Sequence, residues 1–153
     1  MPKTFEDEFT KSQIDMVSIC FEYANYDVEK IYIYGSWENS VLFCDYFFKV
    51  NGRVLQRHHL NQIAGKNYDV SRERQSDCLD ILLEDMEKIK KACKKFGQPM
   101  PTQIKLIYDV TSKKMESEYK YENQYSSVPY KLSEDIADEW FEEVKAQEEG
   151  SAQ

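Results

Sequence analysis

The sequence is poor in the residues from which common enzyme motifs are built. It contains five glycines, two histidines and four cysteines among 153 residues. It has no Gly-x-Gly-x-x-Gly run, no Gly-x-x-x-x-Gly-Lys-Ser/Thr loop and no Gly-x-Ser-x-Gly turn, which excludes the frequent nucleotide-binding and serine-hydrolase motifs. No apolar stretch reaches the length of about 20 residues that a membrane-crossing helix needs. We therefore expect a protein that is not an enzyme and uses no cofactor.

Metal-binding patterns are also missing. The four cysteines are far apart and form no Cys-x-x-Cys pair, which disfavours a zinc site. The only histidines are the neighbours His58 and His59. Adjacent side chains on a strand point to opposite faces, so these two could not bind one metal together. We expect reduced, partly buried cysteines, one surface histidine, one packed histidine and no metal.

The chain also shows no sign of secretion or of several domains. Residues 1–13, MPKTFEDEFTKSQ, lack an apolar segment after a basic start, so no secretory signal is expected and the expected location is cytoplasmic. The length fits one domain. We place this domain at residues 1–149 and expect residues 150–153 to be a frayed tail.

Acidic residues are in excess and lie mainly near the two ends. The formal net charge is −8, with −5 in residues 1–29 and −6 in residues 131–149. Nucleic acids and anionic membranes are therefore disfavoured as partners, because both are polyanions. A negative field of this kind raises the encounter rate with a basic protein. Solubility alone would also explain the charge.

Hydrophobic periodicity predicts three helices, at residues 5–24, at 71–96 and from about Ser133 onward. In the first helix we expect Phe9, Ile14 and Val17 on the buried side. In the second, Ser71 is the expected N-cap and Gly97 the residue that ends the helix. Ser133 is the expected N-cap of the third helix.

Five β-rich segments predict strands at residues 30–37, 41–50, 53–59, 104–110 and 115–122. Asn51 and Gly52 favour a tight hairpin turn, because both residues tolerate a positive φ. The order α-βββ-α-ββ-α with short hairpins predicts an α+β fold built on an antiparallel sheet of about five strands and three helices.

Alternation along the strands predicts one apolar sheet face and one face that grades from aromatic to acidic. Helices on both sides would cover the aromatic part. Alternatively, the aromatic and acidic side chains form an exposed surface for a basic protein, since aromatic residues are enriched at interface cores. The candidate partner-binding residues on this second interpretation are Phe43, Asp45, Phe47, Asp109, Glu116, Glu118, Glu122, Asp138, Glu139 and Glu142.

Four segments together resemble one protein family. They are EKIYIYGSWENS at 29–40, YDVSRERQSDCLDILLEDMEKIKKACKKFGQPMPTQIKLIYD at 68–109, MESEYKYENQYS at 115–126 and DIADEWFEEVK at 135–145. In amino-acid sequence and in the order of elements they are similar to the YezG-type immunity proteins of bacterial polymorphic toxin systems. The resemblance implies a cytoplasmic protein that binds and neutralises a cognate toxin domain, commonly a nuclease, without catalytic residues of its own. A nuclease needs a basic cleft for phosphate, which an acidic protein could fill.

Two other functions stay open at the level of the sequence. One is a small regulatory module that binds a protein unrelated to toxins. The other is a hydrolase that uses carboxylates and a histidine, which requires His58 or His59 in a concave pocket beside a carboxylate. The sequence does not decide between a monomer and a small homo-oligomer.

Overall fold

The structure is a computed structural model and describes residues 4–150. Its elements follow the predicted order α-βββ-α-ββ-α, with one additional short 3-10 helix, η1. Their bounds are α1 (Phe5–Tyr23), β1 (Lys30–Glu38), β2 (Val41–Val50), β3 (Arg53–Gln56), η1 (Arg57–Gln62), α2 (Arg72–Lys95), β4 (Gln103–Asp109), β5 (Lys114–Lys120) and α3 (Ser133–Gly150). The prediction of an α+β fold is confirmed.

The five strands form one antiparallel sheet in the order β3-β2-β1-β4-β5. The predicted turn between β2 and β3 is present, with φ of 49° at Asn51 and 78° at Gly52. Both values are positive, as a two-residue hairpin turn requires. Because β4 pairs with the free side of β1, the first strand in the sequence lies at the centre of the sheet.

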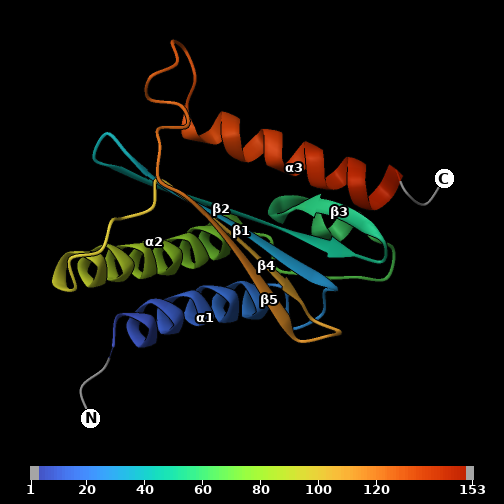
Figure 1. The fold of residues 1–153 in the computed structure, drawn as a ribbon. Helices are drawn as coiled ribbons and strands as arrows, with labels where there is room; N and C mark the ends of the chain where they lie inside the picture. Colours follow the sequence, from blue (N-terminus) through green and yellow to red (C-terminus); the bar gives the residue numbers. More distant parts are fainter. Residues whose placement is uncertain (1–3, 151–153) are drawn as a thin grey trace.

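The sheet is covered unequally on its two sides. Figure 1 shows α1 and α2 side by side across one face, and α3 alone on the other. The larger core lies under α1 and α2 and includes Ile31, Ile33, Tyr46 and Phe48. A smaller aromatic core lies under α3. Because α3 is the only helix on its side of the sheet among the described residues, part of that sheet face stays uncovered.

The buried side of helix α1 matches our prediction at Phe9 and Val17 and differs at Ile14. It starts with a reciprocal capping box between Thr4 and Asp7. Ile14, which we expected on the buried side, is 53% exposed. The polar residue Gln13 is buried instead, because its amide donates to Tyr119 Oη at 2.7 Å and accepts from Ser117 Oγ at 3.1 Å. These hydrogen bonds to β5 let a polar side chain take a buried position.

The predicted caps of α2 are confirmed. Ser71 Oγ accepts from the Arg74 backbone N–H at 3.2 Å. At the other end Gly97 has φ of +65°, and the Gln98 N–H donates to the Cys93 carbonyl at 2.8 Å. This pattern is a Schellman motif, which needs a left-handed residue that glycine supplies at little cost.

The third strand is shorter than predicted. It ends at Gln56, and the chain then turns into η1, where Leu60 is fully buried. His58 and His59 therefore lie on this turn rather than on a strand, and both are exposed. The expectation of one packed histidine was wrong, because turning the chain is what brings Leu60 into the core.

The boundaries of β5 and α3 also differ from prediction. β5 ends at Lys120, so Glu122 lies outside the strand. Ser133 is the first residue of α3 rather than its cap, and the Leu132 N–H donates to the Asp135 carboxylate at 2.8 Å. α3 includes Gly150, which we placed in a frayed tail. Residues 151–153 of that expected tail lie outside the described residues.

The segment from β5 to α3 is fastened to the sheet by one buried carboxylate. Glu38, 2% exposed, accepts from the N–H groups of Gln124, Tyr125 and Ser126 and from Ser126 Oγ, at 2.8 to 3.3 Å. Four donors satisfy the buried charge. Within residues 4–150, no helix is both long enough and apolar enough to span a membrane.

Candidate functional site

Helix α3 lies firmly on one half of its sheet face. Its buried residues are Ala137, Trp140, Phe141 and Val144. The Trp140 and Phe141 rings each lie 5.1 Å from the ring of Phe47, centroid to centroid. Phe47 is 2% exposed. We expected Phe47 at a partner surface, and this expectation was wrong, because α3 covers the aromatic part of the face.

Charged contacts hold the far end of the helix. Glu148 accepts from Lys30 Nζ at 2.9 Å and from Lys49 Nζ at 2.8 Å. These two hydrogen bonds hold the pKa of Glu148 below its ordinary value. Glu149 accepts from the Val54 backbone N–H at 2.8 Å. The helix is thus tied to β1, β2 and β3, and these contacts direct it away from β4 and β5.

The uncovered half of the face forms a groove beside α3. Its volume is about 750 Å³. We call it the α3 groove, and its walls are formed by Lys30 and Tyr32 of β1, Lys105, Ile107 and Asp109 of β4, Ser112, Lys114, Glu116, Glu118 and Lys120 in and beside β5, and Trp140, Glu143, Val144, Gln147 and Glu148 of α3.

Lysine and aromatic groups lie on the inner side of the α3 groove. Lys105 Nζ lies 5.3 Å from the Trp140 ring centroid, within the range of a cation–π contact. Burial lowers the pKa of Lys105, while Glu118 acts in the opposite direction. Glu118 is the direct cross-strand partner of Lys105. The groove therefore has a basic and aromatic wall on β4 and α3, and a row of mixed charge on β5 in which Glu116 and Glu118 lie between Lys114 and Lys120.

Three of the ten predicted partner-binding residues line this groove. Glu116 and Glu118 are exposed on β5. Asp109 lines it too, but its carboxylate accepts from the Ser112 N–H at 3.1 Å, and this bond lowers its pKa. Asp109 thus has a structural task in the β4–β5 turn. Glu122 is exposed in the segment after β5.

The other predicted residues lie elsewhere. Phe43 is half-buried, with its ring 6.0 Å from that of Tyr34. Asp45 forms an ion pair with Arg57, and burial raises the pKa of Asp45. The remaining three, Asp138, Glu139 and Glu142, are exposed on α3. Glu139 forms an ion pair with Lys131 at 3.0 Å. The ten residues do not form one continuous surface.

Sequence reasoning missed the inner wall of the groove. Lys105 alternates with Ile107 and Asp109 on the mixed face of β4. A lysine in the middle of a strand between apolar neighbours was the available signal. The contact of Trp140 with Lys105 depends on where α3 lies, which the sequence pattern of either element does not specify.

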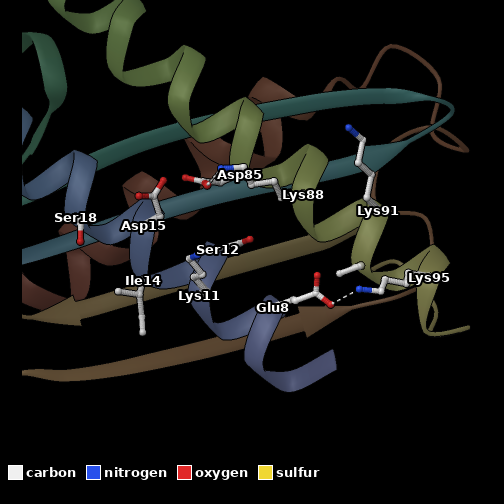
Figure 2. Close-up of a pocket in the computed structure, with 11 residues that line it drawn as sticks. Glu8, Lys11, Ser12, Ile14, Asp15, Ser18, Asp85, Lys88, Lys91 and Lys95 are labelled. Carbon is white, nitrogen blue, oxygen red and sulfur yellow. Dashed lines mark hydrogen bonds and ion pairs between the residues drawn. The ribbon is translucent and has the colours of Figure 1, made fainter. Parts of the chain in front are cut away.

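A second groove lies between α1 and α2 on the opposite side of the sheet (Figure 2). Its volume is about 550 Å³. Figure 2 shows Asp15 of α1 and Asp85 of α2 facing one another, and a Glu8–Lys95 ion pair of 3.3 Å farther along. Asp85 is 1% exposed, and burial, followed by the Asp15 carboxyl, raises its pKa to about 8. The Asp85 carboxyl is therefore mostly protonated at neutral pH.

The two histidines lie outside both grooves. The rings of His58 and His59 lie 3.9 Å apart on η1, and neither lines the two grooves. Burial, together with the positive charges of His59 and Arg57, lowers the pKa of His58. In the part of the chain that is described, neither histidine has a carboxylate in hydrogen-bond reach. Among residues 4–150, no three His, Cys, Asp or Glu side chains cluster as a metal site.

Comparison with known proteins adds no assignment, since no protein-family model matches the chain and no curated protein matches it. The resemblance to immunity proteins remains a hypothesis that rests on the quoted segments.

Proposed function

We propose that this chain is an inhibitor that binds a partner protein in the α3 groove, and that the partner is a toxin domain with a basic substrate cleft. The observation that carries the proposal is the half-covered sheet face. One helix covers the aromatic half, and a groove of about 750 Å³ with exposed carboxylates stays open beside it. A groove of this size accommodates a loop or a helix turn of another protein.

The charge of the α3 groove defines what its occupant must carry. Glu116 and Glu118, which lie between Lys114 and Lys120 on β5, favour lysine or arginine of the partner at these two central positions. Lys105 on the inner wall has the opposite requirement, because a half-buried cation favours an acceptor. The contacting segment would therefore present basic side chains toward β5 and a carbonyl or carboxylate toward β4. A basic loop from the rim of a nuclease cleft satisfies both requirements.

The proposed role as an immunity protein comes from the resemblance, and the acidic surface is compatible with it. The net charge of −8 supports fast association with a basic domain. Inhibition follows if the bound chain occupies the cleft where phosphate would bind. The corresponding location is the cytoplasm of the cell that makes the toxin. No catalytic group of this chain is needed for such a role.

The test is co-expression of the chain with the product of its neighbouring gene. We expect a stable complex in which the partner's nuclease activity is lost. Reversing two groove charges, Glu116→Lys with Glu118→Lys, should slow association about tenfold at low salt and reduce the salt dependence. The matched control is Asp80→Lys with Glu84→Lys, two exposed acids of α2 on the other side of the sheet.

Each outcome separates the candidate functions. No complex with the neighbouring product would overturn the toxin-inhibitor role. A complex that leaves the partner fully active would favour the regulatory module. An equal effect of both double variants would place the interface outside the α3 groove, with the exposed acids of α3, Asp138 and Glu142, as the next surface to examine.

A further inference from the structure

Two cysteines from different helices meet inside the larger core. Cys20 of α1 and Cys78 of α2 are 58 positions apart in the chain, and their sulfur atoms lie 4.0 Å apart. Both side chains are buried, at 0% and 3% exposure. A disulfide needs sulfurs about 2.05 Å apart. Forming the bond would bring the two sulfurs about 2 Å closer than they lie in the reduced chain.

A small pocket is lined by only one of these two cysteines. It has a volume of about 200 Å³ between α1 and α2, and Cys78 forms part of its wall together with Glu22, Tyr23 and Arg74. Cys20 is not part of this wall. A molecule as small as hydrogen peroxide fits the pocket and reaches Cys78 before Cys20.

The surroundings of Cys78 lower the pKa of its thiol. Arg74 lines the same pocket, and its Nε is buried without a hydrogen-bond partner among the described residues. An unpaired guanidinium N–H is available for an anion or a peroxide oxygen. The hydrogen bond from Cys20, ahead of the charges of Arg57 and Arg74, lowers the pKa of Cys78 despite its burial. Burial raises the pKa of Cys20, so Cys20 holds its proton more strongly than an exposed cysteine, and its sulfur lies within hydrogen-bond distance of the Cys78 sulfur.

We propose that Cys78 is a peroxide-reactive thiol and that Cys20 converts its oxidised form into a disulfide between α1 and α2. In the first step the Cys78 thiolate attacks one oxygen of hydrogen peroxide. The O–O bond breaks, hydroxide leaves and is protonated to water, and Cys78 becomes a sulfenic acid. In the second step the Cys20 sulfur attacks the Cys78 sulfur. The S–O bond breaks, and the leaving hydroxide takes the proton of Cys20 to form water.

These two steps balance, since two thiols and one peroxide give one disulfide and two waters. The site does not depend on the proposed partner, because Cys20 and Cys78 lie on the opposite side of the sheet from the α3 groove. The disulfide would fasten α1 to α2, whose contact forms much of the larger core. We expect the oxidised chain to melt at a higher temperature than the reduced chain.

The test treats the folded, reduced chain with one equivalent of hydrogen peroxide. We expect the mass to fall by about 2 Da and the number of thiols titrated after unfolding to fall from four to two. Peptide mapping should show the Cys20–Cys78 link. Four remaining thiols, or a link through Cys44 or Cys93, would overturn the proposal, and this measurement on the unmodified chain needs no variant.

Three variants assign the roles. Cys20→Ser should stop the reaction at a sulfenic acid on Cys78, which dimedone traps and mass spectrometry locates. Cys78→Ser should leave the remaining thiols unreacted at the same dose. Cys44→Ser is the matched control, since Cys44 is equally buried and burial raises its pKa. Its disulfide should form as in the unmodified chain. Dimedone labelling of Cys20 in the Cys78→Ser chain would contradict the order of the two steps.

Discussion

Replacing Asp85 by asparagine should stabilise the folded chain, and the gain should grow as pH rises. The Asp85 side chain is 1% exposed, and its Oδ2 has no hydrogen-bond partner among residues 4–150. Burial first, and the facing Asp15 carboxyl second, raise the pKa of Asp85 from 3.8 to about 8. Lys88 Nζ, at 3.9 Å from Oδ1, opposes the shift only in part. The folded chain therefore holds a proton here that the unfolded chain releases.

The sign and size of the effect follow from this difference in pKa. A group whose pKa is raised by folding stabilises the fold below the unfolded pKa, and this stability is lost as pH rises toward the folded pKa. Each pKa unit corresponds to about 1.4 kcal/mol, so a value of about 8 implies a penalty of about 4 kcal/mol at pH 7. Because Asp15 is exposed to water in the groove, we halve this value and expect about 2 kcal/mol.

Urea unfolding at several pH values measures this penalty. The free energy of unfolding of Asp85→Asn should equal that of the unmodified chain near pH 4 and exceed it by about 2 kcal/mol at pH 7. Carboxylates with lowered pKa, such as Glu148, give the opposite slope, but they are the same in both proteins and cancel in the difference. Asp80→Asn, an exposed acid on α2, is the control and should show no such trend. A difference that is constant with pH would refute a proton held at Asp85.

Two other substitutions test the contacts that place α3. Glu38→Ala removes the acceptor of four hydrogen bonds from residues 124–126. We expect the free energy of unfolding to fall by about 2–3 kcal/mol and proteolytic cleavage within residues 121–132 to become faster. Unchanged cleavage would show that the segment is held by other contacts. Trp140→Ala removes the ring that contacts Tyr32, Tyr34 and Phe47. Chemical unfolding should show that the free energy of unfolding falls by about 3–5 kcal/mol. A fall of less than about 1 kcal/mol would mean that α3 contributes little to stability.

Features of the fold that depend on neighbouring residues were predictable. Ser71 and Gly97 mark the ends of α2 because a side-chain acceptor and a left-handed residue act within one helix turn. Asn51 and Gly52 fix the β2–β3 hairpin for the same local reason. The order of elements and the antiparallel sheet followed from these short connections. Each prediction used a few adjacent residues and needed no knowledge of distant contacts.

Features that depend on distant residues were missed. The buried side of α1 includes Gln13 only because Ser117 and Tyr119 of β5 provide its hydrogen bonds. A pattern of apolar residues assigns Ile14 to that side and cannot detect the polar contact. The end of β3 is set by the burial of Leu60 and by the ion pair between Arg57 and Asp45, and neither contact lies within β3.

The candidate site illustrates the same limit on a larger scale. Strand alternation correctly grouped Phe43, Asp45 and Phe47 on one face with Glu116 and Glu118, but it does not say which part of that face a helix covers. That choice depends on two charged anchors. Glu38 holds residues 124–126 at the end of β1, and Glu148 reaches Lys30 and Lys49. Both anchors direct α3 over β2 and β3. The α3 groove therefore exists because charged contacts at each end of the helix position its aromatic stripe over β2 and β3, which leaves Glu116 and Glu118 of β5 exposed.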